Sequence, residues 1–378
     1  MTGAAAALAG IRVLELSAKG PGPFGVMLLA DLGADVIRID RPSAPARTVQ
    51  DATARGRRSI AIDLKQERGV ELVLALVERA DVLVEGYRPG IAERLGIGPE
   101  TCLERNPRLV YARMTGWGQD GPLARRAGHD INFLSVAGAL YPLGAAEEPP
   151  SPPLNLVGDF GGGGTYLAIG VLAALLERDR SGRGQVVDAA MVDGVSSLLT
   201  AYHSLLQHGL WSEERESNLV DGGAPWYRAY RTADGGYVAV GALEPPFWTT
   251  LLELLELDPA DWPQYAREDW PRQRRGLAQI FETRTRDDWE QLFDGSDACV
   301  SPVLTLSEAT RAPQLAGRGT FVELDGRLTP APAPRLSRTP GNAGGKIAEA
   351  GEHTDAILAE LGLTGPSRDE LRAAGVVA

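Results

Sequence analysis

The sequence predicts an α/β fold with a large Rossmann-like domain built on a parallel sheet and a smaller α+β domain. Three observations predict it. Short apolar stretches alternate with segments of helical periodicity over the first 115 residues, the alternation returns at 155–208, and the pattern then changes to a hairpin followed by helices. Strands separated by helices form right-handed βαβ units, which build parallel sheets. A chain of 378 residues also exceeds the usual size of one core.

The segments of the large domain follow from composition and periodicity. Strands rich in Val, Ile and Leu are expected at 11–16, 34–40, 59–64, 81–86, 108–114 and 184–191. Helices with apolar side chains at helical spacing are expected at 23–33, 66–80, 165–178 and 192–207.

The smaller domain is indicated by a change of pattern near residue 225. Residues 230–243 resemble a β-hairpin with Asp234-Gly235-Gly236 as its turn. Helices are expected at 247–257 and 274–293, and short ones at 354–361 and near Arg368.

The domain boundaries are placed where composition changes. Residues 326–347 are rich in Pro, Arg, Gly and Ala, which is typical of an extended linker. We divide the chain into a large domain at 1–200, a linker helix region at 201–224, a small domain at 225–310, a return linker at 311–347 and a C-terminal segment at 348–378.

Charge and composition exclude several classes of function. The net charge of −12 argues against nucleic acid or an anionic membrane as the main partner. No run of eighteen apolar residues predicts a membrane span, and the opening residues lack the basic start of a signal peptide. Cys102 and Cys299 are far apart and have no metal-type spacing, so buried thiols in a reducing compartment are expected. We therefore expect a cytoplasmic protein.

The turn after the first strand matches a dinucleotide-binding pattern. Residues 20–25 read G-x-G-x-x-G, and Asp40 stands near the place of a ribose-binding acid. An NAD-dependent dehydrogenase is therefore an alternative, although a distant one. Pro21 and Pro23 lack the N–H donors that a pyrophosphate needs, and Pro23 suits the start of a helix, so a structural turn is favoured.

A basic stretch follows in this otherwise acidic chain. Clustered cations near strand ends can form a site for a phosphate-bearing ligand, whereas the ordinary interpretation is a solvated surface. Arg88 and Arg94 would add to it. The clustered residues are Arg38, Arg41, Arg47, Arg55, Arg57, Arg58 and Lys65.

His129 is the histidine best placed for chemistry. It lies in AGHDINF, directly after a loop that follows a predicted strand, and such loops carry the active sites of α/β folds. His203 and His208 lie in an apolar helical run and His353 lies near the end of the chain, so these three are expected to be structural or superficial.

Two carboxylates have weaker claims on sequence alone. Asp159 precedes four glycines, Gly161 to Gly164, which would let backbone N–H groups approach a ligand and stabilise an oxyanion. The same aspartate would also suit a helix cap. Glu244 follows the predicted hairpin and precedes two prolines, where a charged loop residue is ordinary.

Taken together, these segments resemble the family III CoA-transferase superfamily over nearly the whole chain. Within it, GHDINF and LEPPFW look like the α-methylacyl-CoA racemase branch, especially its bacterial members. The matching segments are LAGIRVLEL, GPGP, LADLGADVIRID, DVLVEGYRPG, RLVYARMTGWGQDGP, LNLVGDFGGG, GRGQVVDAAMVDG and GEHTDAILAELG.

The resemblance implies an isomerase with two catalytic bases. His129 and Asp159 would transfer a proton at the α-carbon of a 2-methylacyl-CoA through an enolate, and Glu244 would hydrogen-bond the histidine. Coenzyme A belongs to the substrate, so neither a metal nor an organic cofactor is implied. The residues matched to coenzyme A binding are Arg41, Lys65, Arg94, Arg38 and Asp130.

The resemblance also implies an interlocked homodimer. Both chain ends would build the large domain, with residues 348–378 packing on it, and each active site would combine the large domain of one chain with Glu244 of the partner subunit. The main alternative is a CoA-transferase, in which Asp159 would be the nucleophile that forms an acyl anhydride. His129 favours the racemase, because transferases of the superfamily usually carry a tyrosine or another non-basic residue there.

Overall fold

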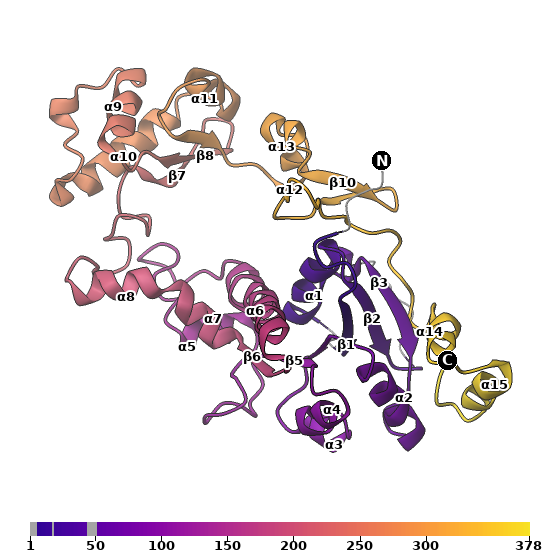
Figure 1. The fold of residues 1–378 in the computed structure, drawn as a ribbon. Helices are drawn as coiled ribbons and strands as arrows, with labels where there is room; N and C mark the ends of the chain where they lie inside the picture. The colour runs from indigo at the N-terminus through magenta and orange to yellow at the C-terminus, as the bar shows by residue number, and fades with distance from the viewer. Residues whose placement is uncertain (1–5, 17–18, 44–50) are drawn as a thin grey trace. The chain divides into compact units, whose positions relative to one another are not determined.

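The computed structural model describes residues 6–16, 19–43 and 51–378, which form two compact units (Figure 1). The first unit comprises Met1–Ala137, Leu154–Leu198 and Gln314–Ala378. The second comprises Gly138–Pro153 and Leu199–Pro313. Each is described by itself.

A six-stranded parallel sheet forms the first unit, in the order β3-β2-β1-β4-β5-β6. The strand order reverses between β1 and β4, as in doubly wound α/β folds, where the loops at the carboxyl ends form binding sites. The predicted strands are confirmed, with the third starting two residues early. Their bounds are β1 (Arg12–Leu16), β2 (Asp35–Asp40), β3 (Arg57–Ala61), β4 (Val82–Glu85), β5 (Val110–Thr115) and β6 (Val186–Ala190).

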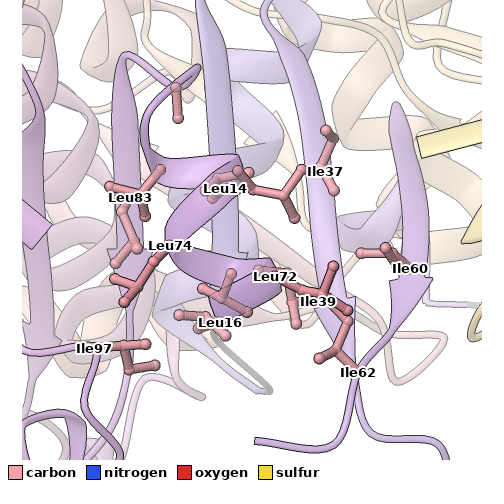
Figure 2. Packing of buried hydrophobic residues seen from close by; sticks show 14 of the residues in the cluster. Leu14, Leu16, Ile37, Ile39, Ile60, Ile62, Leu72, Leu74, Leu83 and Ile97 are labelled. Atoms are coloured by element: carbon pink, nitrogen blue, oxygen red, sulfur yellow. The ribbon is translucent and has the colours of Figure 1, made fainter. Parts of the chain in front are cut away.

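Helices cover both faces of this sheet. On one face Leu72 and Leu74 of α2 (Glu67–Val77) pack with Leu14 and Ile37 of the central strands, as Figure 2 shows. The other face is covered by apolar side chains of α1 and α6. The remaining helices of this unit are α1 (Pro21–Asp31), α3 (Ile91–Arg94), α4 (Pro99–Arg105), α5 (Asp130–Val136), the π-helix Leu156–Gly164, α6 (Thr165–Ser181), α7 (Met191–Leu198), α14 (Thr354–Glu360) and α15 (Gly365–Ala373), with a 3-10 turn at Ala52–Ala54.

The end of the chain returns to the first unit. The N–H of Asp63 donates to the carbonyl of Val376 at 2.8 Å, and the N–H of His353 donates to that of Ser59 at 2.9 Å. Ile357 and other apolar side chains of α14 and α15 join the core beside β3. Helices α14 and α15, at the yellow end of the chain, therefore complete the sheet edge (Figure 1).

The predicted linker at 326–347 is only partly extended. It begins within a hairpin of β10 (Phe321–Leu324) and β11 (Arg327–Pro330), which follows α13 (Pro313–Gly317). Arg55 donates to the carbonyl of Pro330 at 2.8 Å, so the hairpin is anchored to the first unit. This distant contact is not visible in local composition.

The second unit is a smaller α+β body around a three-stranded antiparallel sheet. The predicted hairpin is confirmed, with Gly235 in its turn at φ +79°. A core of tryptophan and phenylalanine side chains, including Trp226 and Phe281, lies beneath it. Its elements are α8 (Thr200–Gln207), β7 (Tyr227–Arg231), β8 (Tyr237–Gly241), α9 (Pro245–Leu254), α10 (Trp270–Phe281), α11 (Arg286–Phe293), β9 (Val300–Pro302) and α12 (Leu306–Ala309), with 3-10 turns at Pro259–Asp261 and Arg267–Asp269.

Two expected helices are each divided. The segment 192–207 is interrupted at Leu199, where the first unit ends and the second begins. The segment 274–293 is interrupted before α11, because the Thr285 hydroxyl accepts the N–H of Asp288 and caps a new helix. Apolar periodicity continues across both breaks, so periodicity alone does not reveal them.

The compact units also differ from the expected boundaries. Residues 138–153, expected in the large domain, belong to the second unit, as do residues 201–224. Arg215 donates to the carbonyls of Leu143 at 2.7 Å and Glu148 at 2.5 Å, and Glu216 accepts the N–H of Ala146 at 2.8 Å. These polar contacts join segments about seventy residues apart.

One helical stretch, Leu156–Ser181, has the length and apolar composition of a membrane span. Its mean hydropathy reaches 1.4 in an 18-residue window, although the sequence contains no unbroken apolar run of that length. Leu167 and Val171 are fully buried in the core of the first unit. The stretch therefore has the packing of a core helix, and length and composition alone are weak evidence for a span.

Candidate active site

A cavity of about 390 Å³ opens at the carboxyl ends of β4 and β5 in the first unit. His129 lies in its wall, together with Tyr87 and Arg88 from the loop after β4 and Trp117 from the loop after β5. Lys19, before α1, contributes from the loop after β1. This position agrees with the rule that α/β sheets place ligand sites at strand ends next to a change of strand order.

His129 is the residue directly before α5, and its loop is held by close packing. A Cβ atom at Gly128 would lie 2.7 Å from the Phe133 ring, and one at Gly116 would lie 2.1 Å from it. The Phe133 ring meets that of Trp117 edge-on at 4.7 Å. Only glycine fits at these two positions, so the aromatic pair determines where His129 stands.

Asp159 lies within the π-helix Leu156–Gly164, a type of distortion that often marks functional sites. The N–H of Asp159 donates to Asp130 Oδ2 at 2.7 Å, and its own Oδ2 accepts a hydrogen bond from Asn155 at 3.1 Å. A Cβ atom at Gly20 would lie 3.3 Å from the same carboxylate oxygen. Asp130 thus holds the backbone of Asp159 and Asn155 holds its carboxylate, which lies close to the first glycine turn.

The glycine turn at residues 20–25 therefore serves packing. Gly20 has φ +66°, where glycine is favoured, and α1 begins at the next residue. A Cβ atom at Gly25 would lie 2.7 Å from the carbonyl oxygen of Gly164. The structural interpretation of this turn is supported.

The expectation for the four glycines after Asp159 was wrong for three of them. Gly162, Gly163 and Gly164 are buried. Cβ atoms at Gly162 and Gly164 would lie 2.8 Å from the Val195 nitrogen and 2.7 Å from the Pro21 carbonyl oxygen. These glycines allow α1 and α7 to approach the π-helix, and they do not present free N–H groups to a ligand.

The charge on Asp159 depends on its surroundings. Burial raises the pKa of Asp159 above its usual value, and the hydrogen bond from Asn155 opposes this rise. The negative charge of Asp130 raises this pKa further, whereas His129 lowers it. The charge of His129 therefore acts on the Asp159 carboxyl.

Asp130 lies mostly beneath the site. It is 6% exposed and holds the backbone of Asp159, and its Oδ1 atom has no hydrogen-bond partner among the described residues. A contact between Asp130 and coenzyme A stays a prediction.

Three of the expected basic residues are accessible. Arg41 follows β2 and Arg94 ends α3, and both are exposed, as is Lys65. Burial raises the pKa of Tyr87, and the positive charge of Arg41 opposes that rise, so Arg41 acts on the wall of the His129 cavity. These three remain available to an anionic ligand.

Three other arginines of the basic stretch are not available, and the anion-site expectation was wrong for them. Arg55 pairs with buried Asp31 at 2.5 Å, and Arg57 pairs with buried Glu15 at 2.6 Å. Arg58 is shared between Asp35 and Glu360. A buried guanidinium requires a carboxylate partner, and that partner lies elsewhere in the sequence.

Arg38 is also buried, at 3% exposure. It donates to Asp40 at 2.7 Å and to the carbonyl of Ala348 at 3.0 Å. Its Nη1 atom has no partner within the described ranges, so a contact with coenzyme A stays a prediction for that atom. Arg47 lies outside the described residues.

Glu244 belongs to the second unit and is exposed directly before α9, where its carbonyl accepts the N–H groups of Phe247 and Trp248 at 3.1 Å. Pairing of Glu244 with His129 stays a prediction. Cys102 is buried, as expected, but Cys299 is exposed, so that expectation was wrong. In the described part of the chain, no group of three or more His, Cys, Asp or Glu side chains has the arrangement of a metal site.

Two contributors to the site were missed. Asn155 stands four residues before Asp159, and polar pairs at this helical spacing are a usable signal. Phe133 reads as an ordinary core residue, and its control over Gly116 and Gly128 appears only in three dimensions.

Comparison with known proteins agrees with this geometry. The profile described as CoA-transferase family III matches residues 8–354. The chain belongs to CoA-transferase family III. Within the family III proteins, it is 46% identical over 360 residues to "Alpha-methylacyl-CoA racemase" of Mus musculus, covering 94% of each chain. It is 45% identical to the protein of that name from Homo sapiens, covering 97% of this chain and 95% of the relative.

A solved structure supports the family III fold. A CAIB/BAIF family protein from Brucella suis aligns with a TM-score of 0.80 and 29% identity. The alignment covers 94% of this chain and 99% of the other.

Proposed function

We propose that this family III protein interconverts the (2R) and (2S) forms of a 2-methylacyl-CoA. The observation that carries the proposal is a histidine in the cavity wall, His129, next to a residue that holds a partly buried aspartate. The N–H of Asp159 donates to Asp130, directly after His129, at 2.7 Å. One base removes the α-proton, and the other returns a proton to the opposite face. The similarity to two proteins named α-methylacyl-CoA racemase supports the same reaction.

Racemisation runs in both directions, and each of the two bases removes the proton in one of them. The two bases therefore need similar pKa values. Unperturbed His and Asp side chains differ by about 2.6 pKa units. Burial raises the pKa of Asp159 toward the unperturbed value of a histidine. Proton transfer between these side chains and the α-carbon requires neither a metal nor an organic cofactor.

The enolate oxygen also needs stabilisation, because a thioester α-proton is weakly acidic. The backbone N–H groups of Asp130 and Ile131, next to His129, donate to no group in the described part of the chain. N–H groups in the first turn of a helix are free to bind a ligand and carry partial positive charge. We assign oxyanion stabilisation to this turn.

The main alternative is CoA transfer with Asp159 as nucleophile, which the family assignment also accommodates. To separate the two, the protein is incubated with one enantiomer of a 2-methylacyl-CoA in D2O, without an acceptor acid. Deuterium incorporation with loss of optical purity supports racemisation. Absence of exchange, together with CoA transfer to an added acid and trapping of Asp159 by hydroxylamine, contradicts it.

The pH profile of racemisation is expected to follow the neighbours of Asp159. Its carboxyl must lose its proton to act as a base, so activity falls as the pH drops through this raised pKa. Asp130→Asn removes a negative charge and moves the acid limb to lower pH, whereas Asn155→Ala removes a hydrogen bond to the carboxylate and moves it to higher pH. The measurement is kcat/KM for exchange against pH.

A matched control for this experiment is Asp179→Asn, an exposed carboxylate on α6. It should leave the acid limb unchanged. Shifts of both test variants in one direction would contradict the assignment of the limb to Asp159.

We further propose an interlocked homodimer in which Glu244 of the partner subunit orients His129. Exposed apolar side chains on α5 and α6, including Val136 at 61% and Leu176 at 68%, support a covered surface on the first unit. Co-expression of His129→Ala chains with Glu244→Ala chains should then restore activity, because each mixed dimer contains one intact site. Mixed dimers that remain as inactive as the parents would contradict it.

A further inference from the structure

Arg113 lies beside the proposed active site and makes no contact with the cavity that the catalytic scheme uses. It is on β5 and is 8% exposed. Its Nε donates to Glu85 Oε1 at 3.0 Å, and its Nη2 donates to Glu93 Oε1 at 2.6 Å. One planar guanidinium therefore joins two carboxylates that are eight residues apart in the sequence.

The first carboxylate holds the cavity wall. Glu85 ends β4 and is 1% exposed, and its second oxygen accepts the N–H of Tyr87 at 2.6 Å. Tyr87 and Arg88 line the same cavity as His129. Through Glu85, Arg113 thus fixes the start of the loop that forms one side of this cavity.

The second carboxylate holds the helix that carries Arg94. Glu93 and Arg94 are the last two residues of α3, which has only four residues and follows Gly90 at φ +83°. So short a helix has little stability of its own. A Cβ atom at Gly90 would lie 3.4 Å from Arg94 Nη1, so the Arg94 side chain folds back over the loop.

We infer that Arg113 is a positioning residue that fixes Arg94 relative to the His129 cavity, so that the phosphates and the thioester of one substrate can be bound at the same time. The inference rests on the proposed function in taking a coenzyme A thioester as the ligand. Glu85 and Glu93 attach the two ends of one segment to the same side chain. Fixing Arg94 in advance reduces the entropy lost when it binds an anion.

If Arg113 has this role, the effect of disturbing it should depend on whether the substrate contains the nucleotide part of coenzyme A. Glu93→Gln keeps the shape of the side chain and weakens its ion pair with Arg113, and Glu93 is exposed enough that the fold should survive. For 2-methylacyl-CoA, we expect Kd and KM to rise about tenfold with kcat within about twofold. For the corresponding 2-methylacyl-pantetheine, which lacks every nucleotide phosphate, Kd and KM should not change.

Two further variants test the path of the effect. Arg113→Lys keeps the charge but cannot join both carboxylates, so binding of the CoA ester should weaken at least as much as in Glu93→Gln. The double variant Glu93→Gln/Arg94→Met should bind the CoA ester no more weakly than Arg94→Met alone, because both changes remove the same contact with the substrate.

Arg105→Met is the matched control, since Arg105 also joins two glutamates, Glu71 and Glu78, but on the exposed surface. This variant should leave Kd and KM unchanged for both the CoA ester and the pantetheine ester. Equal weakening of the CoA and pantetheine esters by Glu93→Gln, or unchanged binding of both, would overturn the inference. Binding measured by calorimetry does not depend on whether the ligand reacts, so this result is independent of the D2O experiment, which tests the proposed reaction.

Discussion

His129→Gln is expected to reduce racemisation of a 2-methylacyl-CoA by about a thousandfold, because one of the two bases is lost. Asp159 remains, so the α-proton of one enantiomer should still exchange with D2O without inversion. Optical purity and deuterium content are measured in the same samples. The fold should be retained, since the histidine side chain lies at a cavity wall and its loop is held by Phe133.

The control for this variant is His203→Gln. His203 is exposed on α8, so this variant should racemise the substrate at the normal rate. Racemisation by His129→Gln at more than about a tenth of the normal rate would be too fast for the loss of a general base. In that case the two-base scheme is wrong, and another residue returns the proton.

Asp159→Asn is expected to reduce the rate of racemisation by a similar factor, about a thousandfold. The enantiomer whose α-proton still exchanges with D2O should be the opposite one. The isosteric amide keeps the backbone bond to Asp130 but cannot accept the α-proton. His129 then exchanges the α-proton of the other enantiomer, the one whose proton is retained in His129→Gln. Affinity for the CoA ester, measured by calorimetry, should stay within about threefold, because Asp159 is not one of the basic residues predicted to bind the phosphates.

The Asp159→Asn variant also tests the transferase alternative. Asp179→Asn should have no effect on either activity, since this carboxylate is exposed on α6. If Asp159→Asn lost CoA transfer to an acid but continued to racemise, Asp159 would be a nucleophile and not a base.

Much of the first unit is predictable because it depends on local pattern. The alternation of apolar strands with amphipathic helices identified the six strands of the sheet, and a proline identified the start of the first helix within two residues. The position of His129 after a strand identified the cavity, because α/β folds place loops of this kind together.

Other features depend on contacts between distant parts of the chain. Arg55 and Arg57 have the same local appearance as Arg41, yet they pair with buried Asp31 and Glu15. The glycines after Asp159 have the composition of a ligand loop, yet Gly162 and Gly164 pack against helices. Local composition does not reveal which residue pairs with a charged side chain or packs against a glycine.

The sequence by itself determined the fold class, the family resemblance and the two proposed bases, His129 and Asp159. These follow from periodicity and from motifs that are contiguous in the chain. Only the tertiary structure decided that Asn155 and Asp130 hold Asp159, that Phe133 places His129, and that some arginines pair with buried carboxylates. The reason is physical, because burial and hydrogen-bond geometry arise from residues brought together across the whole chain.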